Sequence, residues 1–143
     1  MRSWEEKTDM TSRILIAEDE PFILESLTFL LRREGYDLIA VQDGAEVLDA
    51  AERERPDLVV LDAMLPGRDG FAILGDLRAA PFGRSTPVLV LTAKGQDADR
   101  KRMMALGADA FVTKPFANRD LLAQIAGLLD GGGARAPEAN HGT

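Results

Sequence analysis

Short apolar runs rich in Val, Ile and Leu alternate five times with longer segments of helical period along this chain. The apolar runs span residues 13–19, 36–41, 57–62, 87–93 and 110–113. The segments of helical period span residues 21–35, 44–55, 69–80, 97–107 and 118–130. Strands that are apolar on both faces and joined by helices are typical of a parallel sheet covered on both sides. Because crossovers between parallel strands are right-handed, the pattern predicts a doubly wound α/β fold.

The first segment of helical period shows how the helices are expected to pack. Its apolar residues recur at intervals of three and four, and Gly35 is expected to end the helix. The face predicted to be apolar carries Phe22, Ile23, Leu27, Leu30 and Leu31.

Length and composition limit what the fold can be used for. The 143 residues, 45% of them hydrophobic, fit one domain with a core of its own. The absence of Cys excludes disulfides, thiolate nucleophiles and sulfur-ligated metals, and it suits a cytoplasmic protein. No apolar stretch reaches the ~18 residues of a membrane span, and no signal-peptide pattern precedes the first strand. A net charge of −7 without a basic stripe disfavours direct nucleic-acid binding.

The folded domain is predicted to span residues 13–130. Residues 1–12 and 131–143 have the polar, Gly- and Pro-containing composition of flexible tails. The second tail could equally be the start of a linker in a longer regulator.

Polar side chains follow several of the predicted strands, at the sheet edge where doubly wound folds bind ligands. Glu18 and Asp19 follow the first strand, and Asp62 ends the third. Crowded carboxylates repel one another unless a cation neutralises them, and Mg²⁺ is bound by one or two carboxylates plus a phosphate. Thr92 adds a hydroxyl and Lys114 a positive charge. Although an acid at a strand end often serves only as a helix cap, the whole set is what phosphoryl transfer requires.

Four motifs in this order, ILIAEDEP, LVVLDAMLPGRDG, VLVLTA and AFVTKPF, resemble the receiver domain of two-component response regulators, of the chemotaxis single-domain type. The resemblance implies a flavodoxin-like sheet of five parallel strands in the order 2-1-3-4-5. It also implies that Asp62 is the phosphoacceptor. Mg²⁺ would be bound directly by Asp19, Asp62 and the backbone carbonyl of Met64, and through a water by Glu18. Such a protein accepts a phosphoryl group but turns over no external substrate, so an enzyme is not expected.

By the same resemblance, Thr92 is the switch hydroxyl, Lys114 the partner of the phosphate and Phe111 the switch aromatic residue. Met64 and Lys94 stand at the positions that flank the path of the hydrolysing water. A methionine cannot orient that water, and a lysine can stabilise the phosphate, so a long-lived phosphorylated form is expected.

The resemblance also assigns residues that shape loops. Pro66 and Gly67 would shape the loop after the acceptor, and the bond between Lys114 and Pro115 would be cis.

The phosphoryl donor must lie on another protein, because the one histidine of the chain, His141, falls in the predicted tail. The resemblance implies a histidine kinase or a histidine phosphotransfer protein. The output is expected to be a downstream protein effector that contacts residues 97–107, 110–113 and 118–130. In the winged-helix DNA-binding branch of the family, the fifth strand typically opens with two acids and the last helix carries an arginine that pairs across a dimer. At these positions this chain has Ala110 and Gln124. A monomer or a weak phosphorylation-dependent dimer is therefore expected.

Three other classes of protein fit the sequence less well. A haloacid-dehalogenase-like phosphatase needs a second Asp two residues after the nucleophile, where this chain has Met64. A nucleotide or flavin binder needs a phosphate loop after the first strand, where AEDEPF would repel phosphate. A degenerate receiver that acts only as a protein-interaction module is disfavoured by the intact Asp62, Thr92 and Lys114.

One segment of helical period is rich in charge. Arg100, Lys101 and Arg102 lie beside acids, which favours a solvated helix face over a docking patch. Met103 and Met104 fit either the core or an adaptable surface.

Overall fold

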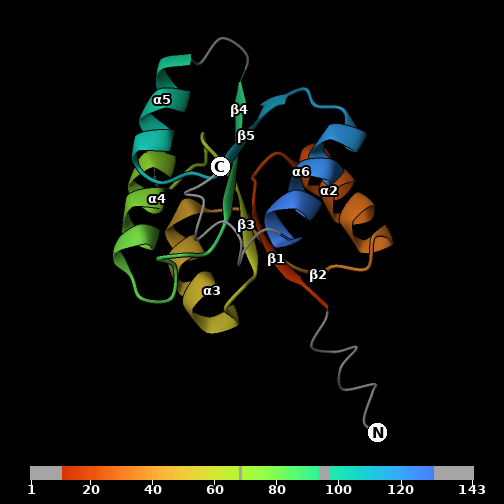
Figure 1. Ribbon diagram of the computed structural model, residues 1–143, viewed down its shortest axis with the longest axis horizontal. Helices are drawn as coiled ribbons and strands as arrows, with labels where there is room; N and C mark the ends of the chain where they lie inside the picture. Colours follow the sequence, from red (N-terminus) through yellow and green to blue (C-terminus); the bar gives the residue numbers. More distant parts are fainter. Residues whose placement is uncertain (1–10, 68, 94–96, 131–143) are drawn as a thin grey trace, which may run out of the picture.

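The computed structural model describes residues 11–67, 69–93 and 97–130. Five strands form one parallel sheet in the order β2-β1-β3-β4-β5, which confirms the predicted fold (Figure 1). The strands are β1 (Arg13–Ala17), β2 (Asp37–Val41), β3 (Leu58–Asp62), β4 (Val88–Ala93) and β5 (Ala110–Lys114). The helices are α2 (Pro21–Arg33), η1 (Gly44–Glu46, a 3-10 turn), α3 (Val47–Glu54), α4 (Gly70–Ala79), α5 (Asp97–Ala105) and α6 (Asn118–Asp130).

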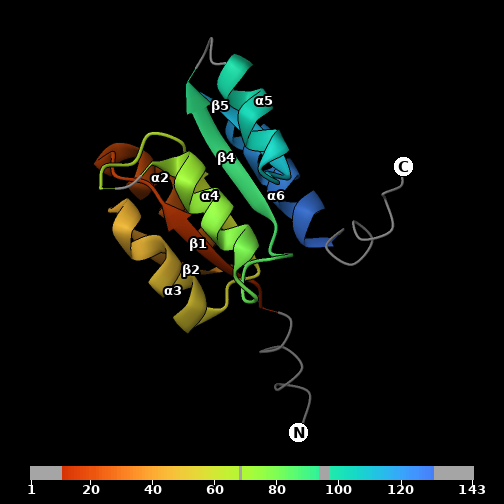
Figure 2. The same ribbon diagram turned by 90° about the vertical axis from the view of Figure 1, so that its left-hand side faces the viewer.

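Helices cover both faces of the sheet. Figures 1 and 2 show α3, α4 and α5 on one face and α2 and α6 on the other. Each face has its own hydrophobic cluster, and alternate residues of the central strands belong to one cluster or the other. Every residue of β3 is buried, which explains why its sequence is apolar without alternation.

The parallel register brings the carboxyl ends of the strands to one edge. Ala17 of β1 is aligned with Leu61 of β3, and Leu91 of β4 is aligned with Asp62. Lys114 closes β5 at the same edge. Side chains that end or follow these strands therefore meet, although they are far apart in the sequence.

Helix α2 begins with a side-chain cap. Glu20 accepts hydrogen bonds from the backbone N–H groups of Phe22 and Ile23, which have no partner inside the helix. Leu27 and Leu31 are buried as predicted, but the prediction that Phe22 shares their face is wrong, because its side chain is 77% exposed. At about 100° per residue, Phe22 points to the side of the helix opposite Leu31.

Several further predictions can be compared with the structure. The peptide bond between Lys114 and Pro115 is cis, as predicted. Met103 is buried, whereas Met104 is 63% exposed. No helix in the described part of the chain could cross a membrane. The predicted tails fall almost wholly on residues 1–10 and 131–143, which lie outside the described residues, as does Lys94.

Candidate functional site

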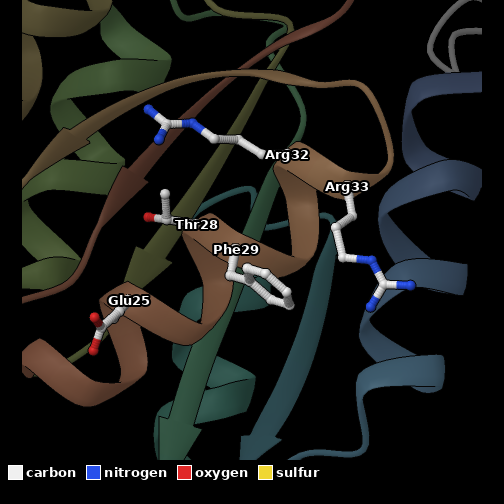
Figure 3. A pocket seen from close by; sticks show the side chains of 5 residues that line it. All are labelled: Glu25, Thr28, Phe29, Arg32 and Arg33. Atoms are coloured by element: carbon white, nitrogen blue, oxygen red, sulfur yellow. The ribbon is translucent and has the colours of Figure 1, made fainter.

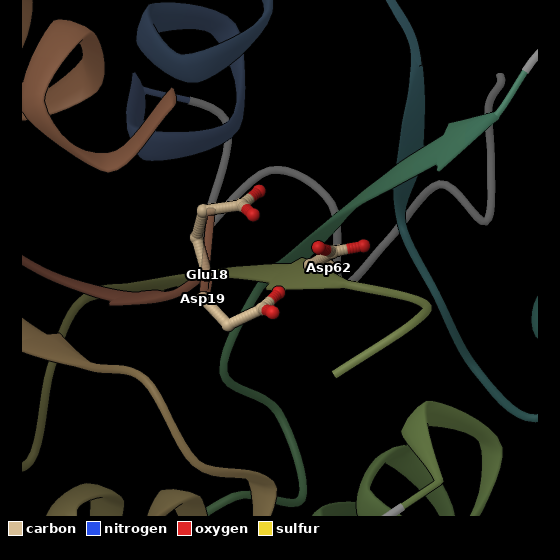
Figure 4. A group of neighbouring side chains, drawn as sticks. All are labelled: Glu18, Asp19 and Asp62. Carbon is tan, nitrogen blue, oxygen red and sulfur yellow. The ribbon is translucent and has the colours of Figure 1, made fainter. Parts of the chain in front are cut away.

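Three carboxylates converge at the carboxyl ends of β1 and β3 (Figure 4). Glu18, Asp19 and Asp62 each offer an oxygen atom, and these atoms lie within 4.8 Å of one another. The register of β1 and β3 causes this convergence, since Glu18 and Asp19 directly follow the residue aligned with Leu61. Glu18 is fully buried and Asp62 is 3% exposed, so the two charges are largely removed from water.

Lys114 joins this group from the end of β5. Its Nζ donates hydrogen bonds to Asp62 Oδ2 at 3.1 Å and to Glu18 Oε1 at 3.3 Å. Burial lowers the pKa of Lys114, but the hydrogen bond to Asp62 and the charges of Asp62 and Glu18 outweigh it and raise the pKa above its ordinary value. The ammonium group therefore stays charged beside both acids.

Glu18 is the most perturbed group of the site. Burial is the main reason that its pKa rises from 4.5 to about 7, and the nearby charge of Asp62 raises the pKa further. The N–H of Glu20, which donates to Glu18 Oε2 at 3.0 Å, and the charge of Lys114 act in the opposite direction. A proton or a cation is thus favoured beside Glu18 near neutral pH.

The donor set fits Mg²⁺. Mg²⁺ prefers carboxylate and carbonyl oxygens, and Glu18, Asp19 and Asp62 supply oxygens close enough to share one ion. Burial and the charge of Asp62 raise the pKa of Glu18 although Lys114 is present. A hard divalent cation held by these oxygens would favour the charged form of Glu18.

Both oxygens of Asp62 are oriented by hydrogen bonds. The backbone N–H of Met64 donates to Oδ1 at 3.0 Å, and Lys114 holds Oδ2. The next residue, Ala63, donates its N–H to the carbonyl of Leu91 at 3.0 Å, which extends the pairing of β3 with β4 past the carboxylate. Asp62 is therefore fixed at both its backbone and its side chain.

Thr92 lies near the end of β4, one residue beyond the partner of Asp62. Thr92 is 2% exposed, and its Oγ1 has no hydrogen-bond partner among the residues that the structure describes. Burying a hydroxyl without a partner costs roughly 1–3 kcal/mol. A group that accepts its hydrogen bond would remove that cost.

The loop after Asp62 is held against the β2–η1 connection. Gly44 donates its N–H to the carbonyl of Pro66 at 2.8 Å. Gly67 has a φ of 87°, and a Cβ atom there would collide with the side chain of Asp43. Glycine is needed at Gly67 for both reasons, which agrees with its predicted role in loop geometry. Met64 is 74% exposed in the same loop.

Phe111 lies apart from the carboxylates, in β5, where it is partly buried against the cluster under α3, α4 and α5. The guanidinium of Arg100 lies 5.2 Å from the centroid of its ring. In the same helix, Arg102 lies 3.9 Å from the ring centroid of Phe71. Arg100, Lys101 and Arg102 are exposed, as predicted for a solvated helix face. The sequence did not reveal the two ring contacts, because the ring partners lie on other elements and no local pattern links them.

Among the residues that the structure describes, α2 contributes to two grooves. One, of about 530 Å³, is formed on the outer face of α2 around Phe29, which is 64% exposed and has Arg33 beside its ring (Figure 3). The other, of about 440 Å³, is lined by Phe22, Ile23, Ser26, Lys114, Pro115, Phe116 and Asn118. An apolar surface thus runs from α2 to the lysine that contacts Asp62.

The family model of the response regulator receiver domain matches residues 14–126. The chain belongs to this family. It is 41% identical over 130 residues to the alkaline phosphatase synthesis transcriptional regulatory protein PhoP of Bacillus subtilis, with 91% of this chain and 53% of that protein covered. The chain therefore spans about half the length of this curated relative.

Solved structures agree with the assignment. A response regulator receiver domain protein from Methanospirillum hungatei superposes with a TM-score of 0.81 at 29% identity, covering 87% of this chain and 98% of that one. The receiver domain of a sensor histidine kinase from Pseudomonas aeruginosa has a TM-score of 0.78 at 31% identity, covering 84% and 98%. The latter structure contains a magnesium ion coordinated in its active-site cleft.

Proposed function

We propose that this receiver domain accepts a phosphoryl group on Asp62 in a Mg²⁺-dependent reaction and thereby relays a signal. The observation that most supports this proposal is the placement of Asp62. Its carboxylate is fixed at the end of a buried strand, beside Lys114 and two further acids. A carboxylate needed only for folding has no reason to lie within such a group, because the acids repel one another.

The chemistry assigned to these residues is a transfer between two proteins. A carboxylate oxygen of Asp62 attacks the phosphorus of a phosphohistidine, the P–O bond forms, and the P–N bond breaks. The imidazole leaves with the electron pair and takes up a proton from solvent. Lys114 neutralises charge on the phosphoryl oxygens. Mg²⁺, held by Asp19, Asp62 and the Met64 carbonyl, with Glu18 acting through a water, would supply further positive charge to those oxygens.

The phosphorylated Asp62 is proposed to act as a switch. The phosphoryl group brings charge and acceptor oxygens, to which the unpaired hydroxyl of Thr92 donates and with which Lys114 pairs. Phe111 then turns inward, and the surface formed by α5, β5 and α6 changes. A downstream protein effector recognises the changed surface. The module relays a signal and turns over no external substrate.

The donor is proposed to be a histidine kinase or a histidine phosphotransfer protein that docks along α2. The groove beside Lys114 and the exposed ring of Phe22 would position its histidine near Asp62. Phe22→Ala should slow transfer from the cognate donor but leave phosphorylation by acetyl phosphate unchanged. Equal effects on both reactions would exclude docking at this face.

A second candidate is that the chain is the receiver part of a longer, DNA-binding regulator. The 41% identity to a transcriptional regulatory protein about twice as long favours it. The receiver itself is proposed to act in the cytoplasm. It is proposed to bind neither nucleic acid nor membrane, because its net charge is −7. Ala110 and Gln124 are consistent with a monomer or a weak dimer on phosphorylation.

Intact-mass measurement after incubation with acetyl phosphate tests the proposal. The wild-type chain should gain the mass of one phosphate when Mg²⁺ is present and none when a chelator is added. Asp62→Asn should gain none, while Asp57→Asn, an exposed acid at the opposite edge of the sheet, should label like the wild type. Undiminished labelling of Asp62→Asn would place the acceptor elsewhere.

A further inference from the structure

Helix α5 is attached to the domain by little buried apolar surface. Of residues Asp97–Ala105, Met103 alone is buried. Helix α4, which lies beside it on the same face of the sheet (Figure 1), buries Gly70, Ile73, Leu74 and Leu77. Other contacts must therefore contribute to holding α5 in place.

Two arginine–aromatic contacts supply part of this attachment. Arg102 of α5 lies 3.9 Å from the ring centroid of Phe71 in α4, and Arg100 lies 5.2 Å from the ring centroid of Phe111 in β5. Both distances are within the ~6 Å over which a guanidinium is attracted to an aromatic face. Arg102 thus connects α5 to α4, and Arg100 connects α5 to the edge strand β5.

Phe111 connects this attachment to the phosphorylation site. It lies three residues before Lys114 in β5 and is aligned with Val90, two residues before Thr92 in β4. Its ring packs against the core, and its carbonyl accepts a hydrogen bond from Gln124 Nε2 of α6 at 3.4 Å. A displacement of the ring that takes it beyond about 6 Å from the guanidinium removes the contact with Arg100.

We infer that Arg100 is a positioning residue that holds the Phe111 ring in its present place and so opposes the change to the phosphorylated conformation. The inference rests on the proposed function, since it concerns the equilibrium that phosphorylation of Asp62 shifts. A contact made in one conformation and lost in the other stabilises the first relative to the second. Removing the guanidinium should therefore favour the activated conformation before any phosphoryl group arrives.

Helix α5 offers matched controls. Lys101 is exposed, has the same charge and, in the described part of the chain, has no ring contact, so Lys101→Ala removes a charge alone. Arg102→Ala removes the contact between an arginine and the ring of Phe71, and it leaves the contact between Arg100 and Phe111 in place. The two controls separate the effect of charge and the effect of loosening α5 from the effect on Phe111.

The test is the affinity of the full chain for beryllofluoride, an analogue of the phosphoryl group, in the presence of Mg²⁺. Arg100→Ala should bind it about two- to fivefold more tightly than the wild type, which corresponds to the ~0.5–1 kcal/mol of an exposed cation–π contact. Lys101→Ala and Arg102→Ala should stay close to the wild-type affinity. Arg100→Lys, which keeps a cation near the ring, should lie between Arg100→Ala and the wild type.

A double-mutant cycle with Phe111→Leu makes the test specific. Without the aromatic ring, Arg100→Ala should produce no further tightening. The amide signals of residues 110–114 in ligand-free Arg100→Ala should also move toward their positions in the beryllofluoride-bound wild type. An unchanged affinity for Arg100→Ala, equal tightening by either control, or persistence of the effect in Phe111→Leu would overturn the inference. If the wild type binds no beryllofluoride, the proposed function itself fails, which is a distinct result.

Discussion

The end of β3 and helix α5 belong to one small domain, but different forces hold them. Leu61 is fully buried, and Asp62 beside it is fixed by hydrogen bonds to Met64 and Lys114. In α5, one buried methionine and two exposed arginines contribute to the attachment. The first region is held by the core, whereas the second is held largely by contacts at the surface.

The difference matches what each region is proposed to do. Phosphoryl transfer is mainly positioning and charge neutralisation, so the nucleophile benefits from a rigid strand end. A surface that changes on phosphorylation must be drawn from parts with low local stability, because only these rearrange for a modest free energy. The division between β3 and α5 would therefore separate the proposed chemistry from the proposed signal output.

The largest effect expected from this comparison concerns stability. Leu61→Ala should lower the free energy of unfolding by about 2–5 kcal/mol, because it leaves a cavity in the core under Asp62. Met104→Ala in α5 should change the free energy by less than about 0.5 kcal/mol, because its side chain is exposed. Urea denaturation of the two variants and the wild type measures both values. Similar losses in both variants would break the comparison.

The next effect concerns the lifetime of the phosphorylated form. Met64 is exposed beside Asp62 but has no strong donor or acceptor with which to orient an attacking water, so the half-life should be minutes or more. The double variant Met64→Asn and Lys94→Glu should lose phosphate at least tenfold faster, or about 1.4 kcal/mol in the barrier. Decay of the labelled protein after removal of the donor gives both rates. A wild-type half-life of seconds, or no acceleration in the variant, would contradict this.

Thr92 lies in β4, one residue beyond the partner of Asp62, and its hydroxyl should contribute to stability in one state only. Thr92→Val removes a buried hydroxyl that has no partner among the described residues, so the ligand-free protein should not lose stability. With Mg²⁺ and beryllofluoride the same change should cost about 1 kcal/mol of the added stability, since the new hydrogen bond is missing. Thr92→Ser, which keeps the hydroxyl, should retain that stabilisation. Thermal denaturation with and without the analogue distinguishes these outcomes.

The sequence predicted the end of β3 far better than it predicted the contacts of α5. The alternation of apolar runs identified all five strands, and the acids at the ends of two of them predicted that three carboxylates would meet. Both features are determined by residues near one another in sequence or at fixed places in a parallel sheet. The exposure of Phe22 was not predicted, because its interval in the sequence was considered without the direction in which its side chain points from the helix axis. The contacts of Arg100 and Arg102 could not be predicted, since they depend on how α5 lies against β5 and α4.

The smallest expected effect tests the electrostatics of the rigid site. The pKa of Glu18 is raised to about 7, so this group is protonated in the metal-free protein below that pH and must lose the proton to accept a cation. Mg²⁺ affinity should therefore fall about threefold between pH 7.5 and pH 6.5. The same shift makes the metal-free protein gain stability as the pH falls from about 7 toward 4.5.

Glu18→Gln should flatten the pH dependence of Mg²⁺ binding between pH 6.5 and pH 7.5. Arg100→Ala should leave that pH dependence unchanged, because Arg100 belongs to the other region. Titration with Mg²⁺ at several pH values measures this, and an affinity independent of pH in the wild type would show that burial does not control the charge of Glu18.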